Sequence, residues 1–295
     1  MTLTEKNHYN PCFWTAYWNF EYLREKRINP SIRQNVREIK VDTLNLKSNK
    51  LLICKTENIF YQKKAGIAVL SEEGINKSFE RMFPNENIKN DDENLNNSII
   101  DFENHFTMLE ETYKTSLEKI ILTEQKLDLN DRVNLSTFVA FQLFRNPNFL
   151  DEMTATFKKN DMEKFELFMT FKSIISKSES LIKFIGPYLF SEWKIYRLSK
   201  NILPLSDNPI MIRKRNLMVA IAPNILLEMN LKIIEKNTDK YIIKKRISYF
   251  KYREFLNRTV TNSSKEIIFG NVEKLLQIKN SMRYKKHLFK IKNVC

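Results

Sequence analysis

The sequence predicts an α+β fold, predominantly helical, with an N-terminal β-hairpin or meander and a small C-terminal sheet. Between residues 36 and 70, apolar and polar residues alternate as they do on half-buried strands. Residues 99–185 instead follow a helical apolar period, and short β-branched or apolar segments return after Trp193. Strands, helices and strands therefore follow one another in blocks, which argues against an alternating βαβ fold.

The N-terminal part divides into an aromatic-rich stretch and a strand region. Residues 7–35 contain Pro11 and Pro30, which interrupt helices and so predict an irregular path. The segments VREIKVDTLNL, LLICKTENIFY and KAGIAVL then predict strands over 36–70. The polar residues 47–50 form a turn that would make the first two strands a hairpin.

Three helices are predicted in the middle of the chain, over residues 99–125, 131–144 and 162–185. The apolar stripe of the first helix consists of Ile99, Phe102, Phe106, Leu109, Tyr113, Leu117 and Ile120. The second helix is expected to stop at Asn146-Pro147 and the third at Gly186-Pro187, since the residue before a proline disfavours the helical conformation.

The C-terminal part begins with the short segments WKIYRL, PIMIRK, LMVAIAP and YIIKKRI, which predict a small sheet. A last helix is expected over 247–268, followed by a short helix. We expect a single domain over residues 1–295, made of N-terminal strands at 36–70, a helical middle at 99–185, a small sheet plus C-terminal helix at 193–279 and a basic tail at 280–295.

The charge of the chain is strongly positive and unevenly distributed. The net charge is +14, from 49 Lys and Arg against 35 Asp and Glu. Residues 71–131 carry a charge of −9, whereas residues 201–295 carry +13. Such a field attracts nucleic acid or an anionic membrane surface. We therefore expect a nucleic-acid partner, and the acidic segment would bind another partner or the basic last third. Lysine-rich helices that only maintain solubility are the alternative.

Several classes of protein are disfavoured by the sequence. No apolar run is long enough to span a bilayer, and the polar first ten residues do not resemble a signal peptide. The three cysteines, Cys12, Cys54 and Cys295, are far apart and suggest neither a zinc knuckle nor a disulfide framework. Together these features predict a cytoplasmic protein. Walker, GxGxxG, HExxH and GxSxG motifs are absent.

Polar residues at unusual positions are the candidates for a site. His8 would serve as a general base or metal ligand, or only as a turn residue before Asn10-Pro11. Glu103 falls at the edge of the first helix's apolar stripe, and Glu110 falls within it. A carboxylate that faces the interior needs a cation, a metal or hydrogen-bond donors. A stripe that is partly exposed to solvent is the simpler explanation.

Two further pairs have both a functional and a structural interpretation. Gln142 and Arg145 continue the inward face of the second helix, where they would grip an anion or satisfy the neighbouring Glu103. Asp207 and Asn208 belong to a Ser-Asp-Asn-Pro turn, which either forms a simple Asx-turn or presents catalytic side chains. Asn257 is another polar residue among apolar ones, on the predicted last helix.

The basic tail combines cations with rings, as segments that contact phosphates and stack on bases do. Its cations are Arg283, Lys285, Lys286 and Lys290, interleaved with Tyr284, His287 and Phe289. An anionic membrane would suit the same segment, and a solvated terminus is the structural alternative.

The motifs HYNPCFW near the start, FVAFQLFRNP at a helix end and LPLSDNPI after a Trp resemble the bacterial family called domain of unknown function 4238. The similarity continues through IAPN at 221–224 and the helix of Asn257, and so covers most of the chain. No established activity comes with this family. The resemblance implies that the polar residues fitting the pattern share one site: His8, Glu103, Gln142, Arg145, Asp207 and Asn208.

Such a set would suit hydrolysis of a phosphodiester. Our first hypothesis is a nuclease-like enzyme of the kind found in bacterial defence or toxin systems, with Mg²⁺ or Mn²⁺ as a suitable cofactor. His8, Glu103, Asp207 and Asn208 would be the catalytic residues, with Gln142 and Arg145 binding the substrate. The alternative is a non-catalytic module that binds nucleic acid or protein, in which the polar residues form a buried network. A peripheral membrane protein is a third possibility.

Overall fold

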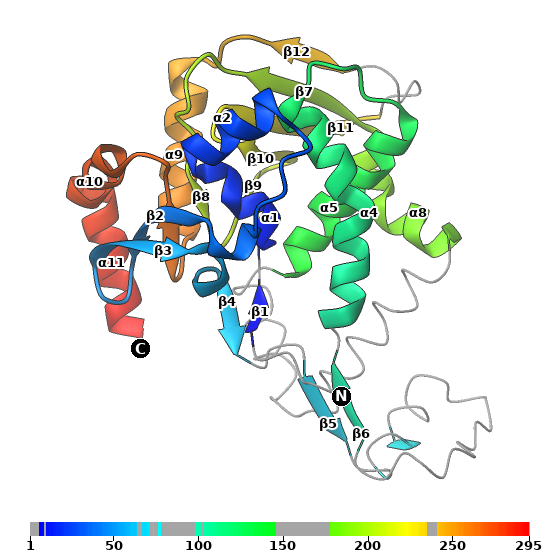
Figure 1. Cartoon of the computed structure of the whole chain (residues 1–295), viewed down its shortest axis with the longest axis horizontal. Coiled ribbons are helices and arrows are strands. Elements are labelled where there is room, and N and C mark those ends of the chain that lie inside the picture. Colours follow the sequence, from blue (N-terminus) through cyan, green and yellow to red (C-terminus); the bar gives the residue numbers. More distant parts are fainter. Residues whose placement is uncertain are drawn as a thin grey trace.

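The computed structural model describes residues 6–8, 10–63, 67–70, 73, 76–77, 98–101, 103–145, 178–234 and 241–294. These residues form a mixed α+β fold (Figure 1). The helices described are α1 (Cys12–Thr15), α2 (Phe20–Ile28), α4 (Glu103–Leu122), α5 (Leu129–Phe144), α8 (Ser178–Leu189), α9 (Tyr249–Asn262), α10 (Val272–Asn280) and α11 (Met282–Val294), with 3-10 turns η1 (Ala16–Trp18), η2 (Val36–Glu38) and η3 (Thr56–Asn58). None of these helices is both long and apolar enough to cross a membrane.

The larger sheet is built from the segment after α8. Its strands are β7 (Ser191–Arg197), β9 (Ile210–Arg213), β10 (Asn216–Ala222), β11 (Ile225–Ile234) and β12 (Ile242–Lys244), in the order β12-β7-β11-β10-β9. All neighbours are antiparallel except β12 and β7. Every residue of β10 after Asn216 is buried, which requires both faces of the sheet to be covered. Helices α4, α5, α8 and α9 supply contacts to it.

The smaller sheet joins the two ends of the chain. Its strands are β2 (Lys40–Asn45), β3 (Lys50–Lys55), β8 (Leu205–Ser206) and β13 (Glu266–Ile268), in the order β3-β2-β13-β8. β2 and β3 pair antiparallel, and β13 inserts between β2 and β8. The N-terminal strands therefore form a sheet with C-terminal strands. Two further antiparallel pairs join β1 (Lys6–His8) to β4 (Tyr61–Lys63) and β5 (Ile67–Leu70) to β6 (Ser98–Asp101).

The aromatic-rich N-terminal segment is helical, contrary to the irregular path predicted for it. Pro11 directly precedes α1, and the side chain of Asn19 accepts a hydrogen bond from Tyr22 N (2.9 Å) at the start of α2. Pro30 lies just beyond the end of α2. Pro11 therefore precedes a helix and Pro30 follows one. Proline has no backbone N–H, and this donor is not needed for hydrogen bonds within a helix at the helix start.

This segment is anchored in the main core. Trp14 is fully buried, donates its indole N–H to Ile221 O (2.8 Å) and packs edge-to-face on Phe138 with 4.8 Å between ring centroids. Trp18 likewise donates to Leu203 O (2.9 Å). The N-terminal helices thus contact both the larger sheet and α5, and Figure 1 shows α1 in front of β9 and beside α5.

The predicted middle helices differ from the observed ones mainly at their ends. Residues 99–101 belong to β6, so α4 begins at Glu103. The predicted helix over 162–185 lies largely outside the described residues, up to 177. Its expected stop at Gly186-Pro187 is wrong, because α8 continues to Leu189. Pro187 lacks an N–H, but Phe190 N still donates to Gly186 O (2.9 Å) and closes the last turn.

Two predictions near the C-terminus are also corrected. The helix predicted over 247–268 ends at Asn262, and residues 266–268 form β13 because β2 and β8 offer them backbone partners on both sides. The predicted basic tail is helix α11. Tyr284 of α11 is buried and donates its hydroxyl to Asn49 Oδ1 (3.0 Å) in the β2–β3 turn.

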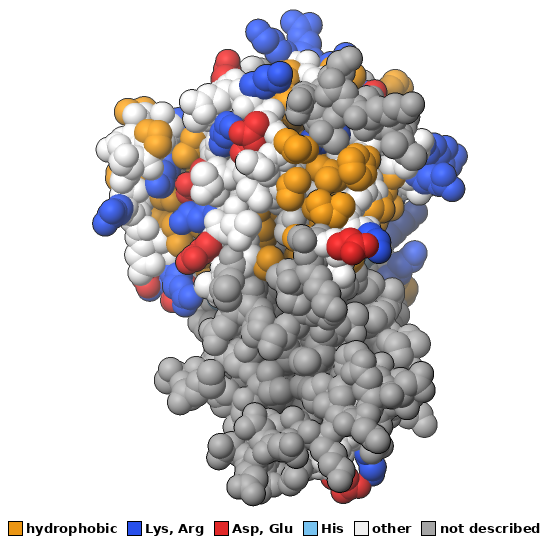
Figure 2. Space-filling model, turned by 90° about the vertical axis from the view of Figure 1, so that its right-hand side faces the viewer, with side chains coloured by type: hydrophobic (Ala, Val, Ile, Leu, Met, Phe, Trp, Pro, Cys, Tyr) orange, Lys and Arg blue, Asp and Glu red, His pale blue; other side chains and the backbone are white. Residues whose placement is uncertain are grey.

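Figure 2 shows a different face of the molecule, on the side of α8. Apolar side chains gather there, and Ile182 and Phe190 of this region are exposed.

Candidate functional site

Residues 8–10 connect the end of α5 with the turn at 206–209. Arg145, immediately after α5, donates from Nη2 to the backbone oxygen of His8 (2.5 Å). Asn10 donates from Nδ2 to the backbone oxygen of Ser206 (2.8 Å). Two clusters of predicted site residues, far apart in the sequence, are therefore joined through the segment that carries His8.

Arg145 is paired with a carboxylate of α4. Its Nη1 forms an ion pair with Glu110 Oε1, and its side chain is 5% exposed. Tyr113 lies one turn beyond Glu110 on α4, and its side chain is buried. Burial raises the pKa of the Tyr113 hydroxyl strongly, and the negative charge of Glu110 adds to this, whereas Arg145 and Gln142 lower it. Glu110 is thus one described partner of Arg145, and the side chain of Glu103 lies outside the part of the chain that the structure describes.

His8 is buried beside the backbone of η3. Its Nε2 lies 3.2 Å from Glu57 O, and its ring centroid lies 6.0 Å from that of Tyr61. A carbonyl oxygen only accepts hydrogen bonds, so in the neutral ring Nε2 carries the proton. Nδ1 then carries the lone pair of the ring.

Three amide side chains around residues 8–10 have buried atoms without a hydrogen-bond partner among the described residues. These atoms are Oδ1 of Asn10, Oδ1 of Asn208 and both polar atoms of Gln142. Gln142 lies close enough to Tyr113 to affect its pKa, but the geometry between them does not make a hydrogen bond. An unpaired buried polar atom costs about 1–3 kcal/mol, so each of these atoms would be stabilised by a water or ligand group that supplies the missing partner.

Asp207 uses its carboxylate to hold the backbone that leads into β13. The side chain is fully buried and accepts from the N–H of Ser264 (3.1 Å to Oδ2), the N–H of Lys265 (2.9 Å) and the hydroxyl of Ser264. Burial raises the pKa of Asp207, and these hydrogen bonds oppose that rise. Because its oxygens are engaged by backbone donors, a metal would have to displace these hydrogen bonds.

Asn208 holds the end of α9. Its Nδ2 donates to the backbone oxygen of Asn262, while the hydroxyl of Ser206 donates to Asn208 O (2.9 Å). In the turn predicted from Ser-Asp-Asn-Pro, each of the three polar side chains therefore forms at least one hydrogen bond with a backbone group. This geometry favours a structural role for the turn and leaves only Asn208 Oδ1 without a partner among the described groups.

A second buried carboxyl near Asp207 gives the protein a testable pH dependence. Glu266 accepts from Phe60 N (2.7 Å), and burial followed by the charge of Asp207 raises its pKa above the usual 4.5. The folded state therefore holds this proton more tightly than the unfolded state. The stability that Glu266 contributes is complete below pH 4.5 and is lost as the pH rises through the folded-state pKa.

As the pH rises from 4 to 7, we expect the unfolding free energy of the wild type to fall relative to that of Glu266→Gln. Urea denaturation at several pH values measures this difference. A difference that does not change with pH would show that Glu266 titrates normally.

The structure thus places the Arg145 side chain, one turn beyond Gln142, on the backbone oxygen of His8, and Asn10 connects the same segment to the backbone of the 206–209 turn. Among the described residues, no three His, Cys, Asp or Glu side chains are arranged to hold a metal ion. Sequence reasoning placed Glu110 in an apolar helix stripe but did not assign it to Arg145. It also named Asn10 only as the residue before Pro11. The predicted nucleic-acid-binding residues lie elsewhere, on the exposed face of α11.

Comparison with known proteins gives a family but no activity. No curated protein and no solved structure matches the chain significantly. The family model described as "Protein of unknown function (DUF4238)" matches residues 57–274. This match spans most of the chain and includes Glu110, Gln142, Arg145 and the 206–209 turn, while His8 and α11 lie outside it. The chain therefore belongs to the DUF4238 family, as the motifs around these residues indicated.

Proposed function

We propose that this protein binds nucleic acid through the outer face of α10 and α11, here called the basic face. The observation that carries the proposal is a group of exposed cations on α11: Arg283, Lys285, Lys286 and Lys290. None of them forms an ion pair with a described carboxylate. The only acidic residue between 272 and 294 is Glu273. Unpaired cations on one surface are the usual footprint of phosphate binding.

The arrangement of α11 supports this proposal. Tyr284 and Leu288 face α9 and the smaller sheet, so the cations point outward at helical spacing. Met282 and Phe289 lie between the cations and are each 70% exposed. An exposed ring surrounded by lysines suits stacking on an unpaired base while the cations contact phosphates.

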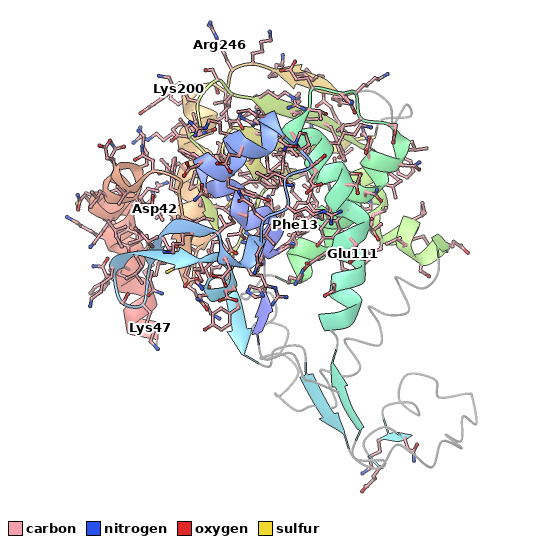
Figure 3. All side chains as sticks on the ribbon, viewed as in Figure 1. Phe13, Asp42, Lys47, Glu111, Lys200 and Arg246 are labelled. Carbon is pink, nitrogen blue, oxygen red and sulfur yellow. The ribbon has the colours of Figure 1, made fainter. Side chains whose placement is uncertain are left out.

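The β2–β3 turn extends the same face. Asn49 accepts the hydrogen bond from Tyr284, and Figure 3 shows the neighbouring Lys47 beside α11. The basic face therefore draws cations from two parts of the chain. Arg246, in contrast, lies at the top of the molecule in the same view, away from Lys47.

Neutralising the basic face should weaken nucleic-acid binding. In a triple variant with Lys285→Ala, Lys286→Ala and Lys290→Ala, we expect a weaker affinity and a plot of log K against log salt that is shallower by about 2–3. Fluorescence anisotropy with labelled RNA and DNA at several salt concentrations measures both quantities.

A matched control removes the same charge elsewhere. This control changes three exposed positions in and after β12: Lys244→Ala, Lys245→Ala and Arg246→Ala. This second triple variant should retain most of the affinity. Equal weakening by the two triple variants would mean that binding follows net charge alone, and would overturn the assignment to α11.

A second candidate function is hydrolysis of a phosphodiester near His8. It is supported by the unpaired buried atoms of Asn10, Gln142 and Asn208 around the segment that carries His8 and its Arg145 contact. Cleavage of labelled RNA and DNA with Mg²⁺, Mn²⁺ or EDTA, beside His8→Gln, tests it. Cleavage lost in a folded His8→Gln variant supports catalysis. Binding without cleavage leaves the polar residues as a structural network.

A further inference from the structure

A pocket of about 130 Å³ lies between α9, α10 and α11, next to the basic face. Residues of α9 and α10 form most of its walls, together with Phe269, Ser281 and Arg283. None of the described residues that line it is acidic. The pocket is small compared with drug-sized sites of roughly 300–1,000 Å³, so it would take one ring system, and a charged group attached to that ring would lie outside it, at the exposed Arg283.

The pocket has an apolar part and a polar part. Val260, Phe269 and Ile278 are buried and belong to the smaller hydrophobic cluster, which gives the pocket an apolar floor with one aromatic ring. Asn257 is half-buried, and its amide forms no hydrogen bond with any described residue. Gln277 accepts from Lys274 Nζ (3.2 Å), so its NH₂ group is directed to other partners. Side-chain amides with unused hydrogen-bonding groups form hydrogen bonds with the edges of unpaired bases.

Two cations complete the lining. Lys274 and Arg283 have no carboxylate partner in the described part of the chain, and Arg283 also belongs to the basic face. A phosphate held by these two residues would continue directly onto the phosphates held by α11. The lining therefore combines apolar surface for a base, amides for its edge and cations for a phosphate.

We propose that this pocket binds a single unpaired nucleotide, with its base on the apolar floor and its phosphate on Lys274 and Arg283. This inference rests on the proposed nucleic-acid binding. Bases in a duplex are stacked and paired, so they cannot enter a pocket of this size. The protein should therefore prefer single-stranded over double-stranded nucleic acid.

The test compares variants that change the pocket with a control variant that adds a ring of the same size outside it. Gln277→Trp places a ring at the pocket, and Asn257→Leu removes the free amide at similar size. Leu276→Trp, on the neighbouring exposed position of α10, is the control. Losing one stacked base costs about 1–3 kcal/mol, so we expect the two pocket variants to bind single strands about 5–150-fold more weakly. Duplex affinity and the control should not change.

The outcomes separate the two proposals. No salt-dependent binding by the wild type would overturn the proposed function itself. Salt-dependent binding with equal affinity for single strands and duplex, unaffected by Gln277→Trp and Asn257→Leu, would overturn the pocket alone. Calorimetric titration with nucleoside 5′-monophosphates distinguishes the source of the nucleotide. Binding that Gln277→Trp abolishes would show that a free nucleotide suffices, whereas loss seen only with oligonucleotides would assign the pocket to a strand held on α11.

Discussion

The Asp207→Ala variant is expected to unfold with a free energy about 3–5 kcal/mol lower than that of the wild type. The substitution removes the buried acceptor of the partly buried N–H groups of Ser264 and Lys265 and of the Ser264 hydroxyl. These groups begin the segment that becomes β13, the strand between β2 and β8. Urea denaturation, with the midpoint and slope fitted separately, measures the loss.

Two further variants test the reason for this loss. Asp207→Asn keeps one acceptor oxygen and should lose less stability than Asp207→Ala. Glu111→Ala removes a carboxylate from the exposed side of α4 (Figure 3) and should change stability by less than about 0.5 kcal/mol. If Asp207→Ala were as stable as the wild type and abolished an activity, Asp207 would be catalytic, as the first hypothesis from the sequence states.

The Arg145→Ala variant is expected to lose about 3–5 kcal/mol of stability, because removing one partner of a buried ion pair leaves the other charge uncompensated. The side chain of Glu110 is 20% exposed, and the backbone oxygen of His8 would also lose its donor. The effect should reach residues 8–10 and the contact of Asn10 with Ser206. Thermal and urea unfolding of the purified variant measure it.

A double-mutant cycle isolates the contribution of the pair. In the Arg145→Met, Glu110→Leu double variant we expect recovery of part of the loss, with a coupling energy of about 1–3 kcal/mol. Additive losses would mean that the ion pair contributes nothing of its own. A stable Arg145→Ala variant that no longer binds or cleaves nucleic acid would instead assign Arg145 as a phosphate clamp.

The two proposed sites have different physical characters. The residues around His8 are buried and largely engaged with backbone groups of distant segments, so variants there should affect stability first. The basic face is exposed and its cations are unpaired among the described residues, so variants there should affect binding and leave stability nearly unchanged. Measuring stability and binding for each variant therefore separates structural from functional residues.

The α+β class and the position of the principal helices could be predicted from the sequence. The apolar stripe of the first long helix is buried at Leu109, Tyr113, Leu117 and Ile120. The start of α5 is set by Asp128, which forms a capping box with Asp131. Both features depend on interactions within a few residues, and sequence patterns report such interactions directly. The unusual polar positions of His8, Gln142 and Arg145 were visible for the same reason.

What the tertiary structure alone decided is which distant groups meet. The sequence placed Glu103 and Glu110 near the same helix stripe but offered only Glu103 as a carboxylate for Arg145, whereas the structure shows an ion pair of Arg145 with Glu110. Asp207 contacts Ser264, 57 residues away, and Asn10 contacts Ser206, 196 residues away. β13 is a strand because β2 and β8 flank it, although its sequence extends a helical pattern. A buried polar group takes its partner from whatever the packed chain brings near it, and that choice depends on the whole fold rather than on neighbours in sequence.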